Sequence, residues 1–258
     1  MLDTLTSYRL ITKDLTKSLN RTASDPIVAR ELKYFKENIG KIKSIDDFIK
    51  NTRIFNFAMK AHGLEDMSYA KAFMRKALTE GIDDPKSFAN RLNDDRYKDF
   101  VQAFNFKEFG EETTARDAVK KETVDKYLRQ TLEANAGAED QGVRLALYFE
   151  RKASSIKGPF DILGDTALFE VVKTAFNLQG SLASGNIDAQ AALLKKKINF
   201  ESLKDPVAVQ GIVKKFATMW DITNNSQSNP ILTLFDSTSS RGIGIDALLS
   251  LQQIRSRG

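Results

Sequence analysis

The chain has 258 residues, of which 41% are apolar and 28% charged, a composition typical of a soluble globular protein with one large domain or two smaller ones. The absence of cysteine excludes disulfides and thiolate chemistry, and the single histidine, His62, excludes a metal site with two histidine ligands from one chain. The net charge of +5 permits an acidic partner without requiring one.

Residues 1–23 are predicted to form an N-terminal amphipathic helix. Apolar side chains recur there every three or four positions, at Leu2, Leu5, Tyr8, Ile11, Leu15 and Leu19. Charged residues such as Asp3 and Arg9 interrupt any signal-peptide core, and no run of eighteen apolar residues occurs. We therefore expect no membrane span, and a protein that is cytoplasmic or exported without a cleaved signal.

Residues 24–222 are predicted to form a helical body. Asp25 followed by Pro26, and Asp205 followed by Pro206, are typical helix starts, and Ser44 is a further N-cap candidate. Glycine at position 81 is a typical helix stop. The predicted helices span, in chain order, residues 26–40, 48–62, 69–80, 84–92, 96–104, 114–136, 141–156, 165–176, 188–198 and 205–220.

Three helix ends share one pattern, at residues 61–64, 103–106 and 175–178. Each places Gly or Asn before an apolar residue, which is typical of a Schellman stop. The similarity continues upstream and suggests duplicated halves, 24–110 and 155–222, bridged by 113–153. The alternative is that amphipathic helices simply resemble one another. On either interpretation the fold class is all-α, an irregular multi-helix bundle.

The segment 223–258 differs from the body. It begins as a polar linker rich in Asn, Ser and Thr, in which residues 230–235 are the best strand candidate. It ends in a short amphipathic segment with apolar residues at Ile245, Leu248, Leu249, Leu251 and Ile254. Both amphipathic termini are expected to cover the body, to pair with each other or to contact a partner.

The chain offers no recognisable catalytic constellation. His62 stands one residue before a helix-stop glycine, which predicts a packing role. Lys195–Lys197 is interpreted as a solvated helix end. We assign no catalytic, cofactor-binding or metal-binding residue and expect no cofactor. Four adjacent carboxylate pairs are interpreted as helix-start residues: Glu65 and Asp66, Asp83 and Asp84, Asp94 and Asp95, and Glu111 and Glu112.

The stretch 44–106, and above all AMKAHGLEDMSYAKAFMRKALTEG at 58–81, resembles the bacterial family known as domain of unknown function 1217. The resemblance extends from about residue 7 to about residue 250. It implies no catalytic residue that could be carried over, and it implies an association with flagellar genes of alphaproteobacteria.

These observations favour a non-enzymatic structural or protein-interaction protein, with a role in flagellar assembly or motility implied by the resemblance. Its expected partner is another protein or a second copy, bound through the amphipathic termini, with flagellar components as candidates. One alternative is an enzyme of unrecognised type. Another is a nucleic-acid-associated regulator, which is less favoured because the basic residues show no clustering with aromatic or asparagine side chains.

Overall fold

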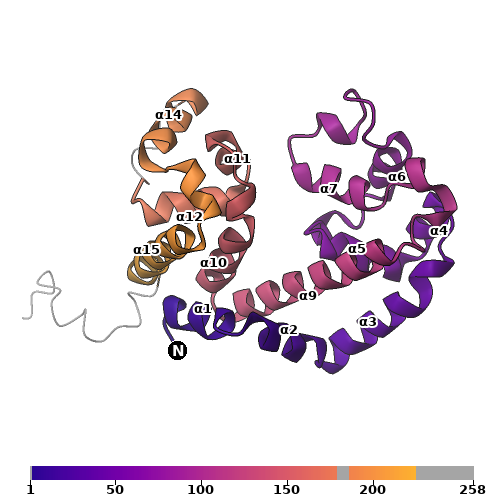
Figure 1. Cartoon of the computed structure of the whole chain (residues 1–258), viewed down its shortest axis with the longest axis horizontal. Coiled ribbons are helices and arrows are strands. Elements are labelled where there is room, and N and C mark those ends of the chain that lie inside the picture. Colours follow the sequence, from indigo (N-terminus) through magenta and orange to yellow (C-terminus); the bar gives the residue numbers. More distant parts are fainter. Residues whose placement is uncertain (1, 179–185, 225–258) are drawn as a thin grey trace, which may run out of the picture. The chain divides into compact units, whose positions relative to one another are not determined.

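The computed structural model describes residues 2–178 and 186–224, and every regular element in these ranges is helical (Figure 1). The predicted all-α class is therefore confirmed for the described residues, whereas the strand candidate at 230–235 and the C-terminal amphipathic segment lie outside them. The helices are α1 (Thr4–Thr12), α2 (Leu15–Ala23), α3 (Pro26–Asn38), α4 (Ile45–Lys50), α5 (Thr52–Ala61), α6 (Lys71–Glu80), α7 (Asp95–Ala103), α8 (Phe106–Phe109), α9 (Asp117–Glu139), α10 (Gln141–Lys152), α11 (Pro159–Leu163), α12 (Thr166–Ala175), α14 (Ile187–Lys197) and α15 (Pro206–Asn224).

Several predicted helix starts are confirmed by side-chain caps. Asp25 Oδ1 accepts hydrogen bonds from the backbone N–H groups at the start of α3, at 2.9 and 3.2 Å. Asp205 does the same for α15 at 3.0 Å. Ser44 caps α4 and Asp94 caps α7. Each cap satisfies N–H groups that have no partner within their own helix, which fixes where the helix begins.

Two of the three predicted Schellman stops are confirmed. Gly63 and Asn177 adopt φ values of 71° and 51°, and the N–H of the residue after each donates to the carbonyl five positions back at 2.8 Å. The third prediction is wrong. Asn105 keeps a φ of −76° and caps α8 instead, accepting from the N–H of Glu108 and donating its own amide to the Glu108 carboxylate.

The same substitution at both asparagines tests this difference. Asn105→Gly is expected to lower the free energy of unfolding by about 1 kcal/mol, because it removes two hydrogen bonds at a buried position. Asn177→Gly is expected to cause no loss, because glycine adopts a positive φ without strain. Urea unfolding followed by circular dichroism measures both values, and equal losses at the two positions would contradict the assignment.

Two predicted helices are interrupted. The helix expected over 48–62 breaks at Asn51, whose side chain accepts from the N–H of Ile54 at 3.2 Å and so starts α5 anew. Residues 1–23 form two helices rather than one, because Asp14 caps α2 by accepting from the N–H of Lys17 at 2.9 Å. Short polar side chains compete with the helical backbone for hydrogen bonds. At Asn51 and Asp14 the side-chain bond replaces the helical one, so a new helix starts.

The prediction of a helix over 84–92 is also wrong. A single 3₁₀ turn, Ala89–Arg91, is found there. The side-chain amide of Asn90 donates to the carbonyls of Ile82 and Asp84, at 2.7 and 2.9 Å, which closes the segment into a compact loop. These bonds, which reach back eight and six residues, replace the helical hydrogen bonds that the Asp-Pro start favoured.

The buried apolar side chains form two clusters. The first core gathers α3 to α8 and the first part of α9, and it is rich in phenylalanine rings, such as Phe48 and Phe104 with centroids 4.8 Å apart. The second core gathers α10 to α15 around residues such as Phe149 and Phe216. Both clusters lie within the compact unit formed by residues up to Trp220. Whether the two cores arose by duplication stays a prediction.

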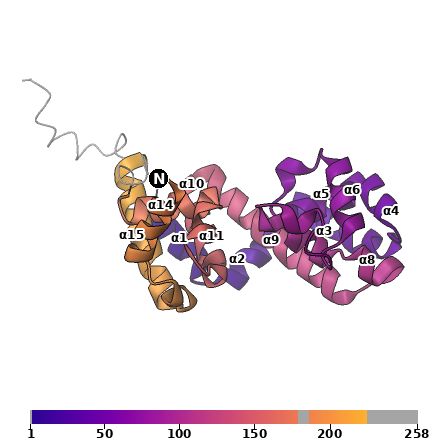
Figure 2. The ribbon, with the colours of Figure 1, turned by 90° about the horizontal axis from the view of Figure 1, so that it is seen from above.

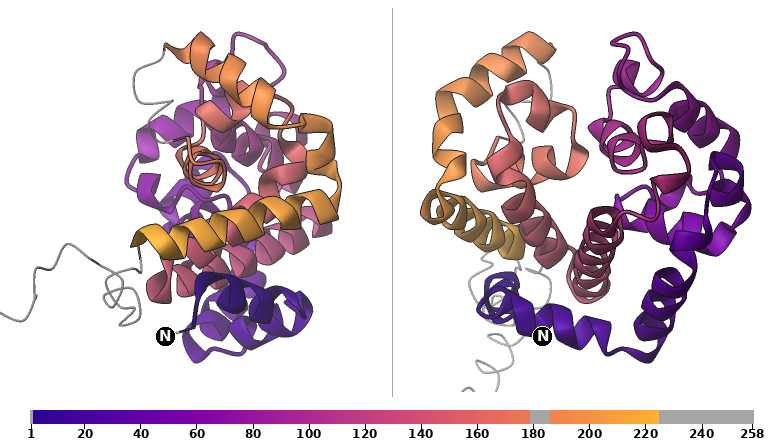
Figure 3. Two further views of the ribbon diagram at one scale, coloured as in Figure 1. Left: turned by 90° about the vertical axis from the view of Figure 1, so that its left-hand side faces the viewer. Right: turned by 45° about the vertical axis from the view of Figure 1, so that its right-hand side comes forward.

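The N-terminal helices cross from one core to the other (Figures 2 and 3). Helix α1 packs on α10, and its Tyr8 is buried in the second core. Helix α2 packs on α9, and α3 then belongs to the first core. The cores therefore differ from the halves drawn from the sequence: the first core also takes in part of α9, and the second also takes in α1 and α10.

Helices α1, α10 and α15 meet at Gly142. A Cβ atom placed there would lie 2.4 Å from the Trp220 ring and 2.9 Å from the Thr4 methyl group. Gly142→Ala is therefore expected to lower the free energy of unfolding by about 1–3 kcal/mol, because both side chains must shift. Gly211→Ala, inside α15 where a Cβ meets nothing within 4 Å, is expected to raise it by about 0.5–1 kcal/mol. Thermal unfolding of the two variants compares them, and similar effects would contradict this close packing.

Candidate functional site

A carboxylate is buried where α9 packs against α10. The Glu133 side chain is only 2% exposed and lies between two guanidinium groups. Arg129, one turn earlier on α9, donates from Nε to Oε1 at 2.8 Å. Arg151 of α10 donates to both oxygens, at 2.8 and 2.9 Å. The three residues form a salt-bridge cluster, called here the Glu133 cluster, that joins the two helices.

The cluster extends toward α1 and α12. Arg129 also donates to the carbonyl of Leu147, at 3.1 Å, and lies 3.7 Å from the Glu150 carboxylate. Tyr148 donates from Oη to Asp165 at 2.5 Å. The carboxylates and guanidinium groups of this junction therefore have protein partners, as buried polar groups require, whereas the buried Tyr8 hydroxyl makes no hydrogen bond within the described residues.

Electrostatics keep these groups in fixed protonation states. Burial, followed by the hydrogen bond to Asp165, raises the pKa of Tyr148 well above its usual value. Burial and then the Glu150 carboxylate raise the pKa of Tyr8 in the same direction. Burial alone would lower the pKa of Arg151, but the hydrogen bonds to Glu133 raise it above its usual value. Both phenols and this guanidinium therefore stay protonated near neutral pH, which suits packing better than proton transfer.

His62 packs against the first core, in agreement with the packing role predicted for it. Its ring contacts Phe100 and Phe104 edge-on, with centroids 5.3 and 5.9 Å apart. Burial, followed by the charge of Lys126, lowers its pKa to about 3. The imidazole is therefore neutral at pH 7. Its Nε2 is buried and makes no hydrogen bond within the described part of the chain.

The predicted carboxylate pairs lie at different places in the fold. Asp94 caps α7 and binds Arg96 through both carboxylate oxygens, and Arg96 also donates to the carbonyl of Gly63. Burial would raise the pKa of Asp94, but the hydrogen bonds from Arg96 lower it. The pairs at 65–66 and 111–112 lie in 3₁₀ turns, and the pair at 83–84 lies in the loop after α6. Within 2–178 and 186–224, no group of three or more His, Asp or Glu side chains could hold a metal ion.

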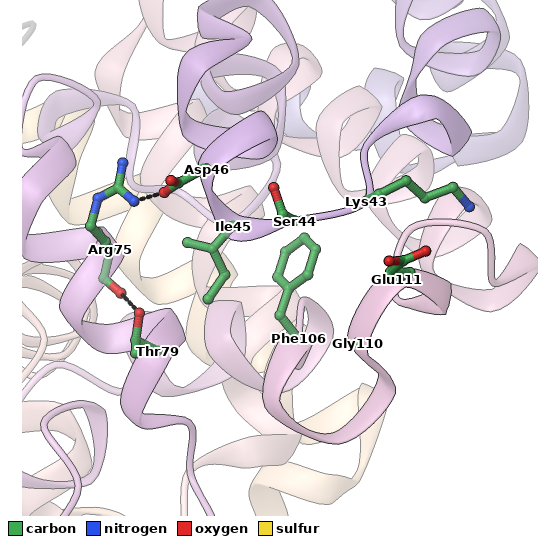
Figure 4. Close-up of a pocket in the computed structure, with 9 residues that line it drawn as sticks. All are labelled: Lys43, Ser44, Ile45, Asp46, Arg75, Thr79, Phe106, Gly110 and Glu111. Carbon is green, nitrogen blue, oxygen red and sulfur yellow. Dashed lines mark hydrogen bonds and ion pairs between the residues drawn. The ribbon is translucent and has the colours of Figure 1, made fainter.

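A pocket of about 410 Å³ opens beside α4, α6 and α8 (Figure 4). Ile45 and Phe106 provide its apolar surface, with Lys43 and Glu111 toward one end. At the other end Arg75 is already paired with Asp46. A second pocket, of about 390 Å³, lies between α7 and α9 and is lined mainly by polar and charged side chains. Neither pocket contains His62 or Glu133.

The remaining sequence predictions concern cations and membranes. Lys195–Lys197 forms the exposed last turn of α14, where positive charge suits the helix dipole. None of the helices that the structure describes has the length and apolar character needed to cross a bilayer. The expectation of no membrane span is thus confirmed for these residues.

The family described as "Protein of unknown function (DUF1217)" matches residues 61–209, more than half of the chain. This chain belongs to the DUF1217 family. The matched range runs from the end of α5 into α15 and therefore includes the Glu133 cluster. The DUF1217 chain is also similar to the crystal structure of protein AGR_C_984 from Agrobacterium tumefaciens. The two are 51% identical, with a TM-score of 0.79, over 86% of this chain and 94% of the other. No curated protein matches this DUF1217 chain.

Sequence reasoning missed the Glu133 cluster. Arg129 and Glu133 are four residues apart on one helix, a spacing that is common for exposed ion pairs. The deciding partner, Arg151, is 18 residues further along and on the next helix. Only the packing of α9 on α10 brings it to Glu133.

Proposed function

We propose that this DUF1217 protein is a non-enzymatic structural or protein-interaction protein that acts in flagellar assembly or motility. The observation that supports a structural role is the Glu133 cluster, whose buried carboxylate and two half-buried guanidinium groups are engaged in joining two helices. The link to the flagellum rests on the association that the family resemblance implies.

The N-terminal helices supply a candidate contact surface. Tyr8 of α1 is buried in the second core, but Leu10 of the same helix is 61% exposed. Leu2, two residues before the helix begins, is 59% exposed. An apolar side chain held on the outside of an ordered helix is available to a partner protein or to a second copy. Single exposed leucines are common, so the experiment must test this helix directly.

A pull-down from motile cells tests the interaction. The Leu10→Glu variant is expected to lose captured flagellar components or, in light scattering across a concentration series, to lose self-association. Lys17→Glu changes an exposed residue of α2 and serves as the matched control. A wild-type protein that stays monomeric and captures no flagellar component would contradict the proposal.

A deletion strain tests the flagellar role. Loss of the gene is expected to reduce swimming in soft agar without slowing growth, and the wild-type gene in trans is expected to restore it. Fractionation of the complemented strain would show whether the protein stays in the cytoplasm or is exported without a cleaved signal. Normal swimming and normal filaments in the deletion strain would refute the role.

A further inference from the structure

The two cores are joined by two separate segments of the chain. Helix α9 contributes Tyr127 to the first core, and its Ala136 packs against the second. The α1–α2 segment forms the other connection: Tyr8 is buried in the second core and Ala23 packs against the first. We infer that α1 and α2 form a strap that, together with the Glu133 cluster, fixes the angle between α9 and α10, and that release of α1 from α10 widens the range of angles between the two cores.

The point of movement is Asp140. It is the one residue between α9 and α10, with a non-helical φ of −150° and ψ of 111°. Its Oδ1 accepts from the N–H of Gly142 at 2.7 Å, which caps α10. A single residue between two helices is the kind of position that can absorb the change in backbone angles during a hinge motion.

The strap holds this hinge residue directly. Thr4, at the start of α1, is fully buried, and its Oγ1 donates to Asp140 Oδ2 at 2.6 Å. The two oxygens of Asp140 are thus divided between the helix that it caps and the strap that crosses it. Any swing of α10 about Asp140 changes the position of the carboxylate that Thr4 binds.

The strap is also built to release more easily than either core. Helix α1 has nine residues, a length at which a helix has little stability of its own. In α2 the one buried side chain is Thr22, at 7% exposure, while Leu15 and Leu19 are only half-buried. Ser18 donates to the carbonyl of Ile11 at 2.9 Å and keeps α1 and α2 together as one piece. Segments with few buried apolar contacts open at lower free energy than cores do.

Because the chain has no cysteine, two introduced cysteines can carry spin labels without interference. Lys98→Cys on α7 and Lys196→Cys on α14 place one label on an exposed site of each core's helices. Thr4→Val keeps the side-chain shape and removes the hydroxyl that binds Asp140. Thr6→Val is the matched control, because among the described residues the Thr6 hydroxyl donates to Asp3, within the first turn of α1, and not to Asp140.

The distance distribution between the labels is measured by pulsed electron paramagnetic resonance, together with hydrogen exchange of the α1 amides. Thr4→Val is expected to speed α1 exchange by about tenfold or more, as loss of a hydrogen bond to a charged group implies. The label distribution is expected to broaden in Thr4→Val and to match the wild type in Thr6→Val. Faster α1 exchange with an unchanged distribution would overturn the inference, and so would no change in either measurement.

Discussion

Replacing Glu133 with glutamine is expected to lower the free energy of unfolding by about 3–5 kcal/mol. The substitution keeps the shape of the side chain but removes the negative charge between Arg129 and Arg151. Two guanidinium groups would then remain close together, and Arg129 would keep only the more distant Glu150 carboxylate, 3.7 Å away, as an acidic partner within the cluster. Loss of one partner from a buried ion pair is costly because the desolvated charge that remains is uncompensated.

Urea unfolding at pH 7 measures this loss, and Glu122→Gln on the same helix is its control. Glu122 forms an exposed ion pair with Lys126 at 2.6 Å, so the same chemical change should cost no more than about 0.5 kcal/mol. Equal effects at the two positions would show that Glu133 is solvated rather than buried between the arginines.

Acid is expected to destabilise the protein through His62, by about 2 kcal/mol between pH 6.5 and pH 5. In the unfolded chain a histidine has a pKa near 6.5, whereas burial lowers the folded value to about 3. The unfolded state therefore binds the proton first as the pH falls. The stability that the neutral His62 ring contributes is fully present above pH 6.5 and is lost progressively as the pH falls toward 3.

Substitution isolates this effect from other titrating groups. His62→Phe removes the ionisable ring from its place against Phe100 and Phe104, so the slope of stability against pH should flatten between pH 6.5 and pH 5. The pKa of Asp94 is already lowered by Arg96, and this carboxyl titrates below that window. Unfolding curves at three pH values suffice, and parallel slopes for the two proteins would refute the buried, neutral histidine.

Local signals in the sequence predicted the features that local chemistry decides. Aspartate followed by proline marked the starts of α3 and α15, because the cap needs only the next few N–H groups. Glycine at position 63 marked a stop because the left-handed backbone is local too. Asn105 carries a similar signal, but its side chain bonds to Glu108 and caps the next helix instead.

The remaining features depend on contacts that reach beyond a single turn of helix. The loop around Asn90 is closed by hydrogen bonds to the carbonyls of earlier residues, and the spacing of apolar residues does not predict these bonds. The Glu133 cluster requires Arg151, which resembles an ordinary surface residue of an amphipathic helix. The sequence therefore predicted the fold class and most helices, but it could not predict the polar cluster that joins α9 to α10.

The position of α1 in the second core has a consequence for folding during translation. The first core draws its buried residues from Val28 to Tyr127, so it can form while the rest of the chain is still being made. Tyr8 leaves the ribosome before any of them, yet its neighbours in the second core extend to Phe216. Thr4 likewise meets Asp140 across 136 positions of sequence. The first helix synthesised is therefore among the last to dock, and its leucines stay open to chaperones throughout that interval.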